Sequence, residues 1–146
     1  MTDLPELEQL TFNRGPIADP EAFARDAGAA SWDYLNGVEF ASMEGGMSYA
    51  QVQAAVPESV NIVTDTAALT VELAREHVDA LDRLPRPTLV TCRAGPRSSA
   101  IAYIYAGLKA GASPEEVLAK ADADGAPFTG QEPLRAWVAD SIRQLR

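Results

Sequence analysis

The sequence contains a single cysteine and a single histidine among its 146 residues. One cysteine cannot form a disulfide within the chain, so we expect a free thiol and a reducing, cytoplasmic location. One histidine and one cysteine are also too few for the clusters that bind zinc, so we expect no metal and no other cofactor. His77 follows Glu76 in a helical segment, where a partly buried packing role is the simpler interpretation.

Long hydrophobic runs and an excess of basic residues are missing as well. The longest apolar run, 100–108, is too short to span a bilayer, and the acidic start 1–6 lacks the features of a signal peptide. The net charge of −9 argues against nucleic acid or an anionic membrane as a partner. The apolar content of 47% is ordinary for a globular protein, and the length suits one domain, 1–146. The oligomeric state is left open.

Hydrophobic periodicity and capping residues predict strands that alternate with helices. Residues 1–19 are expected to be irregular. Strands are expected at 38–43, 59–65 and 88–92, and helices from 19–20 onward and at 48–56, 70–84, 98–111, from 113 onward and at 131–146. This order indicates an α/β fold with a central, mostly parallel sheet flanked by helices. Ligands of such sheets bind at the carboxyl ends of the strands, which is where Cys92 is predicted to lie.

The segment TLVTCRAGPRSSA at 88–100 is the strongest functional signal. It reads as a buried strand that ends in Cys92, then a turn between Arg93 and Arg97, then the start of an apolar helix. Backbone N–H groups and the helix dipole would converge on one point there. Such a field binds an oxyanion and favours the thiolate form of a cysteine. We therefore expect a cysteine nucleophile in an anion pocket, and an inert buried cysteine is the alternative.

Each residue of the loop has an expected role. Gly95 allows the backbone to turn so that N–H groups face the sulfur, and Pro96 stiffens the turn. Arg97 would direct its planar guanidinium at an oxyanion, while Arg93 would point outward and steer anions. The Ser98–Ser99 pair would cap the helix or stabilise a departing thiolate. The expected catalytic residues are Cys92, Arg97 and Asp65, and the expected substrate-binding residues are Arg93, Ala94, Gly95, Pro96, Ser98 and Ser99.

This loop resembles those of two enzyme families. The strand-Cys-loop-Arg-helix unit is similar to the phosphate loop of protein tyrosine and dual-specificity phosphatases, in which five residues separate Cys from Arg. Here four residues separate Cys92 from Arg97, and Thr91 precedes the cysteine in place of a histidine. The shorter spacing resembles the active loop of single-domain rhodaneses, but the rhodanese segments Asp-Val-Arg and Gly-His-Ile are missing, as are the strand and glycine pair that follow a rhodanese's loop helix.

The end of the chain, from Ala112 through Ala121 to the last helix, instead resembles that of the phosphatases. The short loop and the phosphatase-like end of the chain together resemble the phosphatase-like domain of the beta-lactamase-hydrolase-like family. This resemblance extends from about Ser59 to the C-terminus. The resemblance implies a protein tyrosine phosphatase-like fold.

Three functions are compatible with this resemblance. The first is a sulfurtransferase that works through a Cys92 persulfide, because a four-residue spacer would contract the ring of amides around a single sulfur. The second is a phosphatase that acts through a Cys92 phosphothioester with Asp65 as general acid, although Asp65 could simply cap a turn. The third is a catalytically silent module that binds anions or a partner. The expected ligand is a small anionic or persulfide substrate, or a phosphorylated one.

Overall fold

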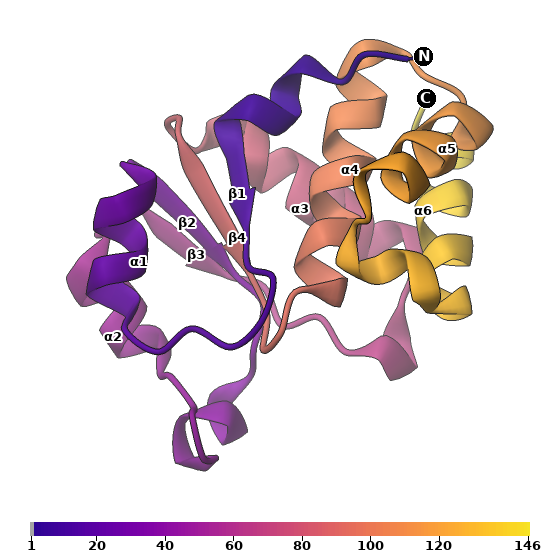
Figure 1. The fold of residues 1–146 in the computed structure, drawn as a ribbon. Helices are drawn as coiled ribbons and strands as arrows, with labels where there is room; N and C mark the ends of the chain where they lie inside the picture. Colours follow the sequence, from indigo (N-terminus) through magenta and orange to yellow (C-terminus); the bar gives the residue numbers. More distant parts are fainter. Residues whose placement is uncertain (1) are drawn as a thin grey trace.

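The computed structural model describes residues 2–146, which form a parallel sheet between two layers of helices (Figure 1). The four strands lie in the order β1-β4-β2-β3, and all three neighbouring pairs are parallel. Their bounds are β1 (Leu10–Phe12), β2 (Ser31–Tyr34), β3 (Ser59–Asn61) and β4 (Thr88–Thr91). The predicted α/β class with a parallel central sheet is confirmed.

The helices cover both faces of the sheet (Figure 1). Helices α1 (Pro20–Ala27) and α2 (Tyr49–Ala55) cover one face. Helices α3 (Val71–Arg83), α4 (Pro96–Ala110), α5 (Pro114–Asp124) and α6 (Glu132–Leu145) form the layer on the other face. Short 3-10 helices are η1 (Pro5–Gln9), η2 (Val38–Ser42), η3 (Thr66–Ala68) and η4 (Pro127–Gly130).

Alternate residues of each central strand enter different cores, because successive side chains of a strand point to opposite faces. Trp32 of β2 and Leu89 of β4 belong to the hydrophobic cluster below α1 and α2. Val90 of β4 belongs to the larger cluster around α4. Helix α4 is buried along most of its length, since it is apolar on all sides, and so it occupies the centre of the second layer.

The helix predictions are confirmed to within a few residues where capping residues are present. Ser48 and Ser113 form capping boxes at the starts of α2 and α5, and Thr70 accepts a hydrogen bond from Leu73 N at the start of α3. These side chains satisfy N–H groups that a helix leaves unpaired, so the boundaries are set locally.

Four of the predictions about the strands and the N-terminal segment need correction. Residues 1–19 are not irregular throughout, because they contain η1 and the edge strand β1, whose three residues are too few to show an alternating pattern. The segment Val38–Met43 is not a strand but contains η2, in which Phe40 is buried and Val38 is exposed. The structure also adds β2, which was not predicted. Its residues are all buried, but Ser31 and Asp33 are polar, so the sequence does not show the apolar run expected of a buried strand. Strand β3 ends at Asn61 and not at Asp65.

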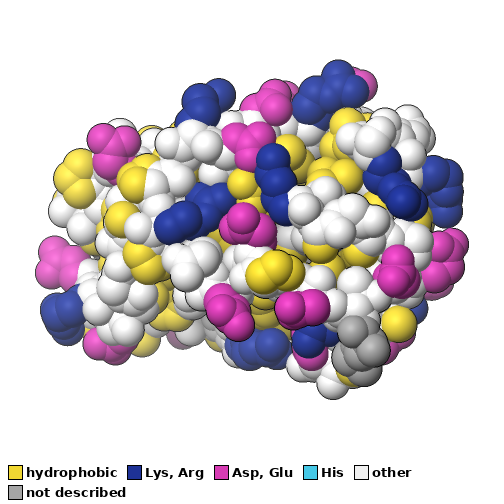
Figure 2. All heavy atoms as spheres, turned by 90° about the horizontal axis from the view of Figure 1, so that it is seen from above, with side chains coloured by type: hydrophobic (Ala, Val, Ile, Leu, Met, Phe, Trp, Pro, Cys, Tyr) yellow, Lys and Arg dark blue, Asp and Glu magenta, His cyan; other side chains and the backbone are white. Residues whose placement is uncertain are grey.

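All four strands end at the same edge of the sheet, and the residues that follow them meet there. Asn13 follows β1, Asn36 follows β2, Thr64 follows β3, and Cys92 follows β4. At the opposite edge, where the strands begin, acidic and basic side chains are interspersed without a field of one sign (Figure 2). No helix within residues 2–146 is both long and apolar enough to cross a membrane.

Candidate active site

Cys92 lies directly after β4, and its side chain is 1% exposed. Its Sγ accepts the backbone N–H of Gly95 at 3.1 Å and lies 3.4 Å from the hydroxyl of Ser98. Gly95 lies in the turn between β4 and α4, and Ser98 lies in the first turn of α4. The Gly95 N–H stabilises negative charge on the sulfur, whereas the one hydroxyl hydrogen of Ser98 has three possible acceptors: Sγ of Cys92, Oδ1 of Asn13 and the Gly95 carbonyl.

The Asn13 side chain holds the Cys92 loop from the end of the neighbouring strand β1. Its Oδ1 accepts from Cys92 N at 3.2 Å and from Ser98 Oγ at 3.0 Å, and its Nδ2 donates to Cys92 O at 2.9 Å. Gly95 has a φ of 117° and packs so closely on the Asn13 carbonyl that a Cβ there would collide with it. The loop can therefore take this shape only with glycine at this position.

Arg97 points toward the ends of β2 and β3. Its Nη1 donates to the Thr64 carbonyl at 2.6 Å, and its Nη2 donates to Asn36 Oδ1 at 3.2 Å. A guanidinium group has more N–H groups than these two acceptors use, so Arg97 retains donors for an anion while the protein holds it in place.

Arg97 borders a cleft of about 320 Å³. The cleft is lined by residues that follow three of the strands: Asn36, Gly37, Glu39, Phe40, Met43, Val63, Thr64, Asp65, Thr66, Arg93 and Arg97. The structure thus brings three of the predicted site residues, Arg93, Arg97 and Asp65, to one cleft. Cys92 is almost completely buried and does not line this cleft.

The remaining predicted residues belong to the loop but contribute in different ways. Ala94 is exposed, Pro96 is half-buried, and Gly95 supplies its N–H to the sulfur. Ser98 reaches the sulfur, whereas the Ser99 hydroxyl is directed at the Pro96 carbonyl at 2.9 Å. Neither serine caps α4, because Gly95 is its N-cap residue and no side chain caps this helix.

Asp65 has its carboxylate at the start of η3, where Oδ1 accepts from Ala67 N at 2.9 Å. This is the turn-capping role that the sequence left open, and it holds the carboxylate at the edge of the cleft. Glu39 is a second carboxylate that lines the same cleft, from the opposite segment η2. The sequence analysis did not single out Glu39.

A buried hydrogen-bonded chain fixes the position of Thr64. His77 Nδ1 lies 2.6 Å from Asp33 Oδ2, and its Nε2 lies 2.7 Å from Thr64 Oγ1. The expectation of a partly buried His77 is wrong: the residue is 1% exposed, and both ring nitrogens have partners. The chain therefore links α3 and β2 to the carbonyl that Arg97 binds.

Asn13, Asn36, Asp33 and Thr64 are the site residues that the sequence analysis missed. Three of them follow directly on, or shortly after, strands whose end points were not predicted. The only local signal for these residues is that each is a polar residue just after a parallel strand. This signal can be used only once the ends of the strands are known.

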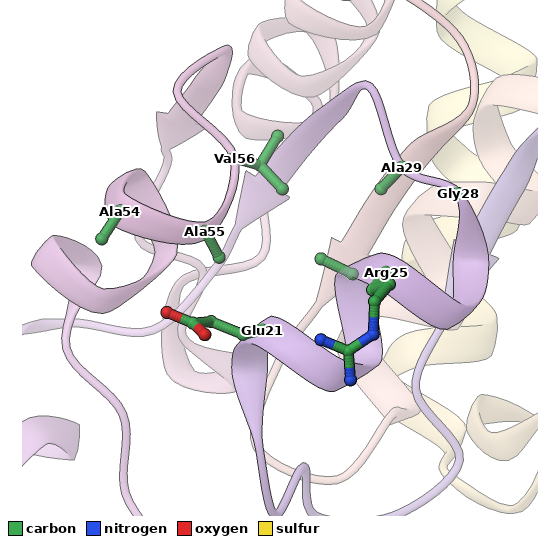
Figure 3. Close-up of a pocket in the computed structure, with 8 residues that line it drawn as sticks. Glu21, Arg25, Gly28, Ala29, Ala54, Ala55 and Val56 are labelled. Carbon is green, nitrogen blue, oxygen red and sulfur yellow. The ribbon is translucent and has the colours of Figure 1, made fainter.

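A second cavity, of about 290 Å³, lies between α1 and α2 (Figure 3). It is lined mostly by small residues such as Ala24, Ala29 and Ala54, with Glu21 and Arg25 at its rim. Its walls include Gly28, Ala29 and Val56, which precede β2 and β3, so it lies at the amino edge of the sheet and away from Cys92. Within residues 2–146 no three His, Cys, Asp or Glu side chains gather as a metal site would require.

No protein-family model and no curated protein sequence matches this chain. Solved structures do match it. Tk-PTP in its active form has a TM-score of 0.71 at 17% identity, covering 93% of this chain and 92% of that one. PTPMT1 has a TM-score of 0.68 at 18% identity, covering 94% and 92%. A proposed phosphatase from Neisseria meningitidis has a TM-score of 0.67 at 17% identity, covering 91% and 93%.

These likenesses show that the chain has the fold of the protein tyrosine phosphatases. The sulfur-transfer hypothesis that the loop spacing placed first is not confirmed by these likenesses. The beta-lactamase-hydrolase-like family is not confirmed.

Replacing Asn13 with Ala should lower the free energy of unfolding by about 1–3 kcal/mol, because the N–H of Cys92 would lose its buried partner. The Cys92 amide should also exchange its hydrogen faster in native-state hydrogen exchange. The Trp32 amide, which donates to Glu58 O, provides the internal control and should keep its protection. Unchanged protection at Cys92 would contradict the role given to Asn13.

Replacing His77 with Leu should lower the free energy of unfolding by about 3–5 kcal/mol, because Asp33 would remain buried without its partner. Oδ1 of Asp33 already has no hydrogen-bond partner within the described residues, which leaves the carboxylate dependent on His77. The double variant Asp33→Leu/His77→Leu should be less destabilised than the sum of the two single variants. Urea denaturation of all four proteins measures this coupling, and additive effects would refute it.

Proposed function

We propose that this protein hydrolyses phosphate monoesters through a covalent phosphothioester on Cys92. The observation that carries the proposal is the sulfur itself, which receives Gly95 N–H and lies beside the Ser98 hydroxyl at the carboxyl end of a central strand. Arg97 has unused donors at the cleft that it borders, and Asp65 lines the same cleft. The neighbour PTPMT1, which has been solved in complex with PI(5)P, supports a small phosphate ester as the substrate class.

In the first step, the Cys92 thiolate attacks phosphorus, forming the S–P bond while the bond from phosphorus to the ester oxygen breaks. The carboxyl of Asp65 gives its proton to the leaving oxygen, and an alcohol departs. In the second step, water attacks phosphorus and passes a proton to Asp65, while the S–P bond breaks and the thiolate returns. Arg97 and the loop amides offset the charge on the phosphoryl oxygens in both steps. No oxidant or reductant takes part.

Sulfur transfer is the second candidate, and the four-residue spacing between Cys92 and Arg97 is the observation that favours it. In that reaction the thiolate would take a sulfane sulfur from a donor anion such as thiosulfate and pass it to an acceptor thiol or cyanide. It needs no general acid, because the leaving groups are already anionic. The two reactions therefore differ in the adduct on Cys92 and in their need for Asp65.

Rapid mixing with an aryl phosphate, followed by an acid quench, should increase the mass of the intact protein by one phosphoryl group, and Cys92→Ser should not acquire it. Thiosulfate is the parallel reagent. A gain of one sulfur atom with thiosulfate and none with the phosphate ester would reverse the assignment in favour of sulfur transfer. If neither reagent forms an adduct, the protein is a catalytically silent module and the proposal fails.

Replacing Asp65 with Asn should lower kcat for phenyl phosphate by about 10²-fold or more, because phenolate is a poor leaving group without a proton. The loss should shrink for dinitrophenyl phosphate, whose leaving group needs no proton. Glu39→Gln is the matched control, since Glu39 lines the same cleft from the other side. A larger loss in Glu39→Gln than in Asp65→Asn would assign the acid to Glu39.

A further inference from the structure

Exposed hydrophobic side chains gather at the mouth of the candidate site. Within residues 2–146 the exposed large hydrophobic side chains are Val38 (90% exposed), Met43 (40%) and Val63 (55%). Val38 and Met43 belong to the η2 segment, and Val63 precedes Thr64. Met43 and Val63 line the arginine cleft, and Val38 lines the cavity beside it. Scattered exposed hydrophobic side chains need no explanation, but three at adjoining hollows indicate a ligand that is itself partly apolar.

An apolar cavity adjoins the arginine cleft. The two share Asn36 and Gly37 as a common wall, and the cavity has a volume of about 220 Å³. Its apolar walls are formed by residues of β2, η2 and α2, namely Tyr34, Val38, Ala41, Tyr49 and Ala50. The rings of Tyr34 and Tyr49 lie nearly parallel, with centroids 6.2 Å apart and an interplanar angle of 11°.

Within residues 2–146 most polar groups of this cavity are paired within the protein, and the exception, Nδ2 of Asn36, has no partner but is buried away from the surface. The Tyr34 hydroxyl donates to Met47 O at 2.6 Å, and the Asn61 amide donates to the carbonyls of Tyr34 and Asn36. The Ser48 hydroxyl is part of the capping box of α2. Burial raises the pKa of the Tyr34 phenol above its usual value, so its ring is uncharged at neutral pH. The surface left for a ligand is therefore apolar.

The size of the cavity limits its occupant. An apolar cavity of about 150 Å³ binds benzene, so about 220 Å³ is enough for one aromatic ring or a short branched chain. The neighbouring cleft carries the guanidinium groups of Arg93 and Arg97, which attract an anion. A ligand that fits both has an anionic group next to one ring-sized apolar group.

We propose that the cavity lined by Tyr34, Tyr49 and Ala50 is a substrate subsite for a ring-sized apolar group on the alcohol side of a phosphate monoester. This proposal rests on the phosphatase function proposed above. The phosphoryl group binds at the Cys92 loop beside Arg97, which borders the cleft, and the apolar group of the same molecule is buried in the cavity. Such binding raises kcat/KM mainly by lowering KM, because the group is far from the bonds that change.

The test compares ethyl phosphate with phenethyl phosphate. Both leaving groups are primary alcohols of similar acidity, so a difference in kcat/KM reports binding of the ring and not leaving-group chemistry. We expect phenethyl phosphate to be favoured by roughly ten- to hundredfold, the range that burial of one phenyl group supports.

Two variants on α2 separate the cavity from other effects. Ala50 lines the proposed subsite, whereas Ala54, one turn later, lines the cavity between α1 and α2, and both side chains are exposed. Ala50→Leu should remove most of the preference for phenethyl phosphate over ethyl phosphate. Ala54→Leu should keep the preference.

Equal kcat/KM for the two esters in the unmodified protein, or a preference that survives in Ala50→Leu, would overturn the subsite. If neither ester is hydrolysed, the proposed function fails, and calorimetric titration with both esters then decides the subsite alone. Tighter binding of phenethyl phosphate that Ala50→Leu abolishes supports the subsite in that case, and equal affinities refute it.

Discussion

The amide side chain of Asn13 is the contact on which the candidate site depends. It pairs with both backbone groups of Cys92 and with the Ser98 hydroxyl, across 79 residues of sequence in the case of Cys92. A loop of four residues between Cys92 and Arg97 has little internal hydrogen bonding of its own. Without a partner on β1, the N–H of Cys92 would be buried and unpaired, which costs more than most single contacts contribute.

The other side of the site is held by a different constraint. Thr64 offers its carbonyl to Arg97 while its hydroxyl meets His77, and His77 in turn is paired with the buried Asp33. Burying a carboxylate is costly unless it is paired. The hydrogen bonds from Asp33 through His77 to Thr64 therefore favour one arrangement of β2, α3 and the segment after β3. Cys92 is thus positioned by Asn13, directly after β1, whereas Arg97 is positioned by residues that follow β2 and β3. A parallel sheet brings both supports to one edge, because all its strands end there.

The segment that follows β2 borders both the cleft of Arg97 and the apolar cavity beside it. The segment after β2 carries Asn36, which holds Arg97, and continues into η2, which carries Glu39 and the exposed Val38. Anion binding and the apolar walls of the adjoining cavity therefore lie on one short stretch of chain. If the proposed function holds, changes in η2 would alter which alcohol is accepted without moving Cys92, since the cysteine loop is held by Asn13, directly after β1.

The sequence by itself determined the local features: the capped helices, the strand that ends in Cys92, the arginines of the loop and the α/β class. Each of these is encoded by neighbours in the chain, such as Ser113 with Glu116 at the start of α5. Only the tertiary structure decided that β1 belongs to the sheet, that His77 is fully buried, and that Asn13 and Thr64 hold the loop and its arginine. Those outcomes depend on pairing between strands distant in sequence, and a three-residue strand or a single polar residue carries no periodic signal of such pairing.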